Sequence, residues 1–268
     1  MLRQVSYIIF ILCFFNTNVF ALDYKLQLKK SIAVENGYFT TDPIGNIYLV
    51  KDNNFIIKYN SLGDSIGVFN DISAGPVTSI DASNPLRVLV FYSGFSQIKI
   101  LDNMLSLKNK LDLSNLGLFN IPAIANSMDG NIWVFDPTGN LLKINDRLEI
   151  QHSYPLRNMI DFVVSPSHMV ERDRTLYMTD TTQGIMQFDR YGFYRTVYRF
   201  RTSECNVMNN YIVYYADGKL HSYNIKSLQA SVIDLPDPNS IQFARIEKNY
   251  IYILRSAKID IYSFQQNK

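Results

Sequence analysis

The sequence has few cysteines, little excess of either charge and no long apolar segment after its first residues. Its 26 Lys and Arg residues nearly balance 24 Asp and Glu residues, for a formal net charge of +2. That balance argues against a nucleic-acid binder that works through bulk positive charge. Two cysteines in 268 residues exclude a small scaffold stapled by disulfides. With 47% hydrophobic and only 19% charged residues, the composition is that of a chain that folds around a core.

The first 21 residues are expected to be a secretory signal peptide. Arg3 supplies a positive start, Tyr7–Phe15 is an unbroken apolar run, and Val19–Ala21 places small residues before a cleavage site. The run is shorter than the roughly 20 apolar residues of a membrane span, which argues against an anchor. Cleavage leaves residues 22–268 with Cys205 as their only cysteine. The absence of an Asn-x-Ser/Thr sequon favours a bacterial protein exported to the periplasm.

Apolar runs of strand length recur about every forty residues, and internal repeats of this period are typical of repeat architectures. The main runs are rich in β-branched and aromatic residues: Asn46–Val50, Arg87–Phe91, Asn131–Phe135, Thr175–Thr179, Tyr211–Tyr215 and Tyr250–Leu254. A second run follows each after a short polar turn: Phe55–Asn60, Gln97–Asp102, Leu141–Asn145, Ile185–Asp189, Leu220–Asn224 and Ile259–Ser263. A shorter run precedes each: Tyr38–Thr41, Val77–Ile80, Ala123–Ala125, Phe162–Val164, Asn206–Met208 and Phe243–Ile246.

A fourth run follows in most units, so the sequence predicts an all-β fold, a six-bladed β-propeller with four-stranded antiparallel blades. Residues 22–268 would form this single domain. The last unit lacks a fourth run, whereas an extra alternating run, Tyr24–Leu28, precedes the first unit. We expect this N-terminal strand to close the last blade and protect its edge. Two packed β-sandwiches are the alternative, and the regular spacing favours the propeller.

Two of the units resemble blades of NHL-like propellers. The matching segments are Thr175–Asp180, Gly184–Arg190 and Gly192 in one unit, and Asn46–Val50, Lys58–Asn60 and Gly63 in another. The resemblance implies the propeller fold. NHL-like propellers are mostly platforms that bind ligands or proteins, and some are enzymes, so the fold alone does not decide the function.

A second resemblance lies in the unit that contains Asp81–Tyr92 and Gln97–Asn103. These segments are similar to a stretch in exported, propeller-like proteins of bacteria that have a type IX secretion system. That group includes plug-type subunits at the periplasmic mouth of an outer-membrane channel. The resemblance implies a non-catalytic scaffold or plug whose partner is a protein, such as an outer-membrane channel.

No catalytic residue, cofactor site or metal site is predicted. The expected innermost strands are apolar or hydroxylic, and Asp42 and Asp129 precede Pro and Gly as turn residues do. The three histidines lack a ligand at metal-binding spacing, and there is no nucleophile elbow, phosphate loop or dinucleotide motif. Cys205 is expected to be a buried thiol. The alternatives are a metal-dependent propeller hydrolase or lyase, and a propeller that binds a glycan or small ligand.

Two groups of residues are predicted to bind a protein partner, because apolar loops and arginine–aromatic clusters are enriched at interfaces. One group lies in expected loops: Phe95, Leu116, Leu118 and Phe119. The other lies in an arginine- and aromatic-rich segment: Arg190, Tyr191, Phe193 and Arg195. The alternatives are a loop that folds back under its own blade, and an ordinary blade edge with basic side chains along it. The near-zero net charge disfavours nucleic acid as the partner.

Overall fold

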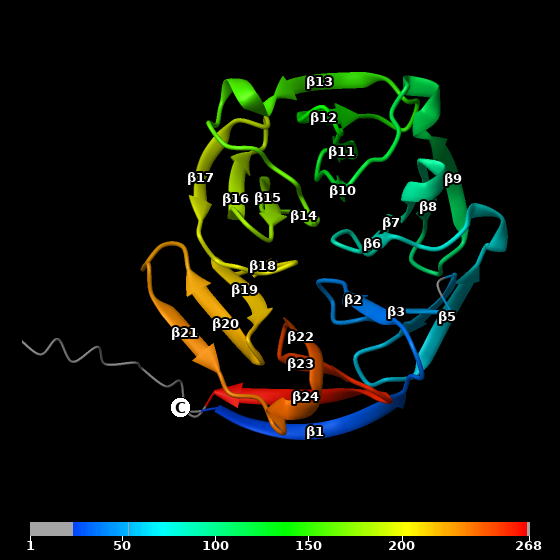
Figure 1. Ribbon diagram of the computed structural model, residues 1–268. Coiled ribbons are helices and arrows are strands. Elements are labelled where there is room, and N and C mark those ends of the chain that lie inside the picture. The colour runs from blue at the N-terminus through cyan, green and yellow to red at the C-terminus, as the bar shows by residue number, and fades with distance from the viewer. Residues whose placement is uncertain (1–23, 53, 267–268) are drawn as a thin grey trace, which may run out of the picture.

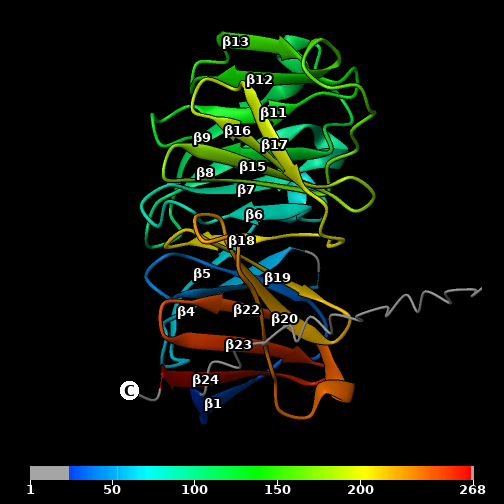
Figure 2. The ribbon, with the colours of Figure 1, turned by 90° about the vertical axis from the view of Figure 1, so that its left-hand side faces the viewer.

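The computed structural model describes residues 24–52 and 54–266, and these form six four-stranded antiparallel sheets around a central channel (Figure 1). The fold class predicted from the sequence is therefore confirmed. Figure 2 shows the ring edge-on, with the blades stacked around it. The predicted signal peptide lies outside the described residues. Among the described residues, no helix is long and apolar enough to cross a membrane.

In blades 1 to 3 the strands follow one another from the channel outwards. Blade 1 consists of β2 (Tyr38–Thr41), β3 (Ile47–Lys51), β4 (Phe55–Tyr59) and β5 (Ser65–Asn70). Blade 2 consists of β6 (Ser79–Asp81), β7 (Val88–Tyr92), β8 (Gln97–Leu101) and β9 (Leu107–Asp112). Blade 3 consists of β10 (Ala123–Asn126), β11 (Ile132–Phe135), β12 (Asn140–Ile144) and β13 (Ile150–Pro155).

Blades 4 and 5 repeat this order, and blade 6 takes its outermost strand from the start of the chain. Blade 4 consists of β14 (His168–Arg172), β15 (Thr175–Asp180), β16 (Gly184–Asp189) and β17 (Tyr194–Tyr198). Blade 5 consists of β18 (Asn206–Met208), β19 (Tyr211–Ala216), β20 (Lys219–Asn224) and β21 (Ala230–Ile233). Blade 6 consists of β22 (Ile241–Glu247), β23 (Tyr250–Arg255), β24 (Lys258–Gln266) and β1 (Tyr24–Ala33).

The N-terminal strand closes the ring, as the sequence predicts. β1 pairs antiparallel with β24 over its whole length, and the register shifts once, between Leu28 and Lys30. The strand extends to Ala33, five residues beyond the predicted run. Pairing covers the edge of β24, so the two ends of the chain hold the ring shut without a covalent link.

Each interface between neighbouring blades holds its own cluster of buried hydrophobic side chains among the described residues. Trp133 of β11, with no exposed surface, packs between blades 3 and 4, and Tyr252 of β23 packs between blades 6 and 1. Burying a large apolar side chain stabilises a fold by about 1.5–3 kcal/mol. The β-branched and aromatic runs of the sequence thus form strands because both faces of each inner sheet are covered.

One predicted strand is wrong. Phe162–Val164 was expected to be the innermost strand of blade 4, but that strand is β14, His168–Arg172. Val163 is 87% exposed and lies in a long connection, and Pro166, which has no N–H for a ladder, separates this segment from β14. The other five innermost strands begin and end within two residues of their predicted positions.

The ring has two distinct ends. One end, called here the loop face, carries the connections between blades and the turns between second and third strands. The connections contain the 3₁₀ turns η1 (Ile72–Ala74), η3 (Leu113–Leu116), η4 (Leu156–Asn158) and η5 (Pro238–Ser240), and η2 (Ser93–Phe95) is a turn between second and third strands. The other end, the turn face, carries the turns that join first to second strands and third to fourth strands.

Candidate functional site

On the turn face, three equivalent turns each present one large apolar side chain to solvent. Ile44, Leu86 and Met128 lie in the connections from first to second strand of blades 1, 2 and 3. Their exposed fractions are 52%, 72% and 64%. The three connections belong to successive blades, so these residues follow one another around the turn face. We call the three residues the apolar turn surface.

Polar residues of the same turns fix the backbone of two of these apolar tips, Ile44 and Leu86. Asp42 accepts hydrogen bonds from the backbone N–H of Ile44 at 3.1 Å and of Asn46 at 2.9 Å. Asn84 accepts one from the N–H of Leu86 at 3.0 Å. Side chains that bond their own backbone two residues on are a common way to fix a turn. Ile44 and Leu86 are therefore held in place by their own turns, whereas Met128 is held by hydrogen bonds to Glu171 and Arg174 of blade 4.

A cavity of about 410 Å³ opens beside Met128, between blades 3 and 4. Its wall includes Met128 and Tyr191 at the rim, with the cations Arg174 and Arg190. The backbone N–H of Arg174 donates to the Met128 Sδ atom at 3.3 Å, which ties the turns of blades 3 and 4 together. Here the apolar turn surface meets the basic and aromatic side chains of blade 4.

The floor of this cavity is fixed by a buried carboxylate. Glu171 of β14 accepts hydrogen bonds from Trp133 Nε1 at 2.5 Å, Ser127 Oγ at 2.8 Å and the backbone N–H of Met128 at 3.1 Å. Lys143 of β12 lies 4.3 Å from the centre of the Trp133 ring and donates to Asp129 at 2.5 Å. Lys143 is paired with Asp129, and the Glu171 carboxylate is satisfied by hydrogen bonds, so the exposed rim is the part that remains open to a partner.

The structure divides the predicted partner-binding residues between the two faces. Phe95 and Phe119 lie on the loop face with 54% and 55% of their surface exposed. Leu116 and Leu118 are half-buried and pack against the core between blades 2 and 3, as the alternative of a folded-back loop describes. As partner-binding residues, these four stay a prediction.

The second predicted group, Arg190, Tyr191, Phe193 and Arg195, lies at the turn-face edge of blade 4 and at the start of β17. The Arg190 guanidinium lies 4.4 Å from the centre of the Tyr191 ring. The backbone carbonyl of Arg190 accepts a hydrogen bond from Lys143 Nζ at 3.2 Å. Phe193 is 51% exposed, with its ring 5.5 Å from that of Tyr154. Arg190 and Tyr191 of this group line the cavity beside Met128, and the role of all four residues in binding also stays a prediction.

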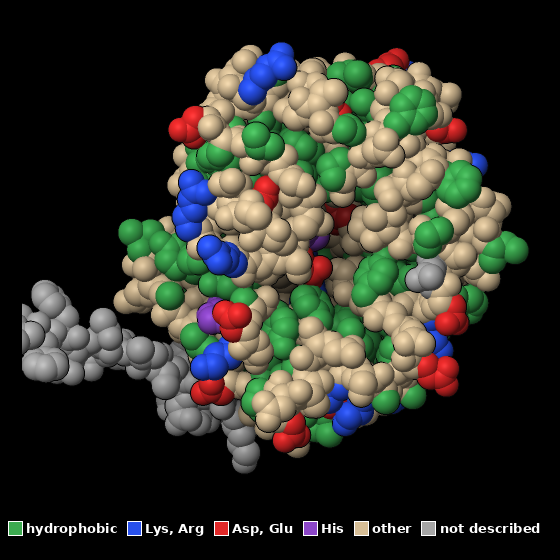
Figure 3. Space-filling model, viewed as in Figure 1, with side chains coloured by type: hydrophobic (Ala, Val, Ile, Leu, Met, Phe, Trp, Pro, Cys, Tyr) green, Lys and Arg blue, Asp and Glu red, His purple; other side chains and the backbone are tan. Residues whose placement is uncertain are grey.

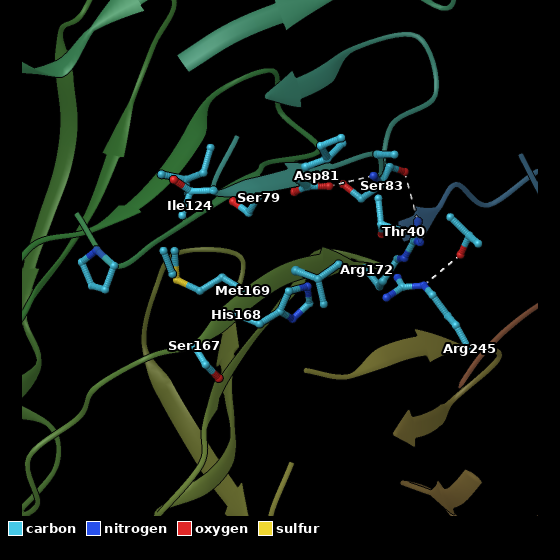
Figure 4. A pocket seen from close by; sticks show the side chains of 17 residues that line it. Thr40, Ser79, Asp81, Ser83, Ile124, Ser167, His168, Met169, Arg172 and Arg245 are labelled. Atoms are coloured by element: carbon cyan, nitrogen blue, oxygen red, sulfur yellow. Dashed lines mark hydrogen bonds between the residues drawn. The ribbon is translucent and has the colours of Figure 1, made fainter. Parts of the chain in front are cut away.

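The central channel contains a second candidate site, a polar cavity of about 70 Å³. Figure 3, which views the loop face, shows the hollow in the middle of the ring. Figure 4 shows Ser79, Asp81 and Ser83 on one side of this cavity, and His168 and Arg172 on the other. Because the innermost strand of blade 4 was expected at Phe162–Val164, the sequence did not place His168 or Arg172 in the channel.

Two arginines bridge the blades across the channel. Arg245 of β22 donates from Nε to Thr41 at 2.8 Å and from Nη1 to Glu204 at 2.9 Å. Arg172 donates from Nη1 to the carbonyl of Ser83 at 3.0 Å, and its Nη2 lies 3.7 Å from Glu247. Blades 1, 2, 4 and 6 are thereby joined through side chains that line the channel.

Burial shifts the pKa values of three of these channel groups. Burial lowers the pKa of Arg172 and raises the pKa of Glu247, in each case against the attraction of the opposite charge. Burial also lowers the pKa of His168, with nearby Glu204 opposing and Arg245 adding to the effect. All three shifts favour the neutral form, so these buried charges are only partly compensated by one another.

Metal-binding geometry does not occur among the described residues, where no three His, Cys, Asp or Glu side chains converge. Asp42 and Asp129 are turn residues, as predicted, since both accept hydrogen bonds from backbone N–H groups of their own turns. Cys205 is buried as predicted, and burial raises the pKa of its thiol to about 12. Such a thiol is a poor nucleophile at neutral pH.

Sequence reasoning missed the apolar turn surface, although the sequence contains a signal for it. Ile44, Leu86 and Met128 are 42 residues apart in each case, and each is the single large apolar residue in a turn rich in Asp, Asn, Pro or Gly. A repeated apolar residue at a position that a turn does not require could have identified this surface.

No family model matches the sequence, and the search of curated proteins found no match. Solved structures do match. The WD40 domain of Pan2 from Neurospora crassa has a TM-score of 0.64 and 10% identity, over 91% of this chain and 96% of that one. The Cps50 (Swd1) β-propeller domain of Myceliophteria thermophila has a TM-score of 0.59 and 9% identity, over 89% and 99%.

An enzyme is also among the similar structures. A catalytically inactive histidine-to-alanine variant of virginiamycin B lyase from Staphylococcus aureus, with quinupristin, has a TM-score of 0.61 and 14% identity, over 90% of this chain and 99% of that one. At these identities the likeness shows the propeller fold and does not decide between a binding protein and an enzyme. The six-bladed propeller is thus the architecture of this chain.

Proposed function

We propose that this chain is a non-catalytic, protein-binding propeller whose partner docks on the turn face over blades 1 to 3. The observation that carries the proposal is the apolar turn surface, where Ile44, Leu86 and Met128 are exposed in equivalent connections of three successive blades. Apolar side chains held in solvent by fixed turns cost free energy in the isolated chain, and a partner that covers them recovers it. The fold itself gains nothing from their exposure.

Residues next to this surface also favour docking of the partner on the turn face. The cavity beside Met128 can receive a side chain of the partner, and Tyr191, Arg190 and Arg174 lie at its rim. Aromatic and arginine residues are enriched among the residues that dominate binding at protein interfaces. Met104 and Leu62, in turns between third and fourth strands of blades 2 and 1, extend the apolar area outward, with 61% and 58% exposed.

We further propose that the chain works in the periplasm, as a scaffold or plug of an outer-membrane secretion complex of the type IX kind. The predicted signal peptide supports export. The resemblance of Asp81–Tyr92 to exported propeller-like proteins supports the envelope role, and Leu86 lies within that segment. The partner would be a protein, such as an outer-membrane channel.

Affinity capture from gently solubilised envelopes tests the proposal. The bait would be the purified chain with its turn face intact, compared with a variant in which Leu86→Asp and Met128→Asp place carboxylates on the apolar turn surface. We expect a stoichiometric partner on the unchanged chain and its loss from the variant. Retention of the partner by the variant would place docking elsewhere.

A matched control comes from the other half of the same face. Asn210→Asp and Lys248→Asp lie in the equivalent turns of blades 5 and 6. They add carboxylates at the same radius of the ring without touching an apolar tip. The control variant should keep the partner, because both positions are polar already, with Lys248 exposed and Asn210 half-buried.

The lyase neighbours define the contrasting outcome. Incubation of the purified chain with quinupristin, followed by chromatography, should return the compound unchanged. Conversion of the compound, abolished by His168→Ala in the channel, would instead support an enzyme.

A further inference from the structure

Two buried nitrogen atoms that lack a hydrogen-bond partner lie in the wall of the central cavity. They are Nδ1 of His168 and Nε of Arg172. Both side chains line the 70 Å³ cavity, and they come from the two ends of the same strand, β14. An unpaired buried polar group costs about 1–3 kcal/mol. Two in one cavity therefore indicate a place where a ligand can supply the missing bonds.

The cation in this wall is incompletely neutralised. Arg172 has 12% of its side chain exposed, and its nearest carboxylate, on Glu247, is 3.7 Å away. That carboxylate oxygen already accepts from Asn206 at 2.9 Å. Burial keeps the pKa of Arg172 below its ordinary value in spite of Glu247. The Nε–H of Arg172 is a donor without a hydrogen-bond partner, on a side chain that lines the cavity.

The opposite wall of the cavity contributes hydroxyl groups and one carboxylate whose two oxygens already accept hydrogen bonds. Thr40, Ser79 and Ser83 line the cavity. Asp81 accepts from the backbone N–H of Ser83 at 2.7 Å and from that of Asn126 at 2.6 Å, so both of its oxygens are engaged with the turn side of the blade (Figure 4). Ile124 and Met169 add an apolar part to the wall.

We propose that the channel binds a small oxyanion, a carboxylate or phosphate group, between Arg172 Nε and His168 Nδ1. The volume of about 70 Å³ exceeds the roughly 10–15 Å³ that a single water needs. Arg172 donates from Nε–H to one oxygen of the anion, and the neutral His168 imidazole donates from Nδ1–H to another. The hydroxyl groups of Ser79 and Thr40 complete the shell. The anion enters from the loop face, where the channel opens (Figure 3).

Isothermal titration calorimetry of the purified chain tests this, with sodium acetate and sodium phosphate as separate probes and sodium chloride at equal ionic strength as the reference. We expect saturable binding of at least one probe and at least about tenfold weaker binding, equivalent to about 1.4 kcal/mol, in His168→Phe and in Arg172→Lys. Arg172→Lys keeps the positive charge but removes the Nε–H. A response to acetate alone assigns a carboxylate, and a response to phosphate alone assigns a phosphate.

His221→Phe is the matched control. His221 lies in β20, where its ring is 5.0 Å from that of Tyr214 and outside the channel cavity. This variant should bind as the unchanged chain does. Circular dichroism melting shows which variants fold, and His168→Phe suffices if Arg172→Lys does not. No saturable binding of either probe, or equal binding in a folded His168→Phe variant, would overturn the proposal.

Discussion

Blades 1–3 and blades 4–6 share one sheet topology but differ on the turn face. In blades 1–3 the first and second strands are joined by the longer connections 42–46, 82–87 and 127–131, each with an exposed apolar tip. In blades 4–6 the same strands are joined by two residues, all polar or charged: Asp173 and Arg174, Asn209 and Asn210, Lys248 and Asn249. The fold is thus built equally well with either kind of turn.

The two-residue turns of blades 4–6 also show which backbone conformation joins the first strand tightly to the second. Asp173 and Arg174 have φ values of 50° and 60°, and Asn209 and Asn210 have 49° and 67°. A two-residue turn with positive φ at both central residues matches the twist of two paired strands best. Blades 1–3 have longer turns in place of this one, and each places an apolar side chain in solvent. This difference shows that the propeller fold does not require the apolar turn surface.

A second difference lies beneath that surface. The third strands of blades 1, 2 and 3 each bury a lysine against an aromatic ring: Lys58 against Tyr48, Lys99 against Tyr92 and Lys143 against Trp133. Two of these lysines reach the next blade, through the carbonyls of Asn103 and Arg190. At the position of Lys143, blade 4 has Gln187. Buried cations therefore brace the half of the ring that carries the apolar tips.

The largest expected effect comes from removing the strand that holds both halves together. Deleting residues 24–33 exposes the edge of β24 and opens the ring between blades 6 and 1. We expect loss of cooperative unfolding, because the buried cluster that includes Ile32 and Val34 loses one side. Thermal melting followed by circular dichroism measures the cooperativity of unfolding. A deletion variant that melts like the full chain would show that the ring does not need this closure.

The next largest expected effect is on the affinity for the partner, and it compares the turn face of blades 1–3 directly with that of blades 4–6. The triple variant Ile44→Asp, Leu86→Asp and Met128→Asp should weaken partner binding by at least about 100-fold, because carboxylates would be desolvated at the centre of the interface. Thermal stability should change little, since all three side chains are exposed. Surface plasmon resonance with the captured partner measures the affinity. Equal loss of affinity in the Asn210→Asp and Lys248→Asp variant would remove the distinction between the halves.

The buried lysines give a smaller effect on stability. Lys143→Ala removes a side chain that is 4% exposed, together with its contacts to Trp133, Asp129 and the carbonyl of Arg190. We expect a loss of about 2–4 kcal/mol in the free energy of unfolding, as for other large-to-small changes in a core. Gln187→Ala in blade 4 is the counterpart, for which we expect about 1 kcal/mol. Urea unfolding measures both, and equal losses would contradict the bracing role of the lysine.

The smallest effect is a dependence on pH at the boundary of blades 1 and 2. The hydrogen bond from Lys99 lowers the pKa of Asp71 from 3.8 to about 2. The lowered pKa means that Asp71 stabilises the fold above pH 4 and loses that contribution as the pH falls toward 2. Because Asp71 is partly exposed, we expect about 1–2 kcal/mol. In Asp71→Asn this part of the pH dependence should disappear from urea unfolding curves, and its persistence would assign it to other carboxylates.

The sequence predicted the architecture well because the architecture depends on repeated, local patterns. Six units with the same order of runs leave one way to pair the strands, and the alternating run from Tyr24 has one free edge to cover. The failure in blade 4 has a physical reason. β14 carries His168, Glu171 and Arg172 because it faces a polar channel and a buried carboxylate site, so its composition resembles a loop.

The candidate sites were harder to predict because they depend on tertiary placement. Asp42 and Asp129 were interpreted as turn residues, and the apolar residues beside them in the same turns, Ile44 and Met128, were not considered. Only the ring brings the turns of Ile44, Leu86 and Met128 to the same face. For the same reason Leu116 and Leu118, apolar residues in a loop, proved to be half-buried.

Site-specific photo-crosslinking in intact envelopes is the most direct test of docking over blades 1–3. A photoreactive phenylalanine derivative would replace Leu86 in one variant and Lys248 in another, at equivalent turns on opposite halves of the turn face. Docking on the apolar turn surface predicts a discrete crosslinked protein from position 86 and none from position 248. A crosslink from position 248 and none from position 86 would contradict it.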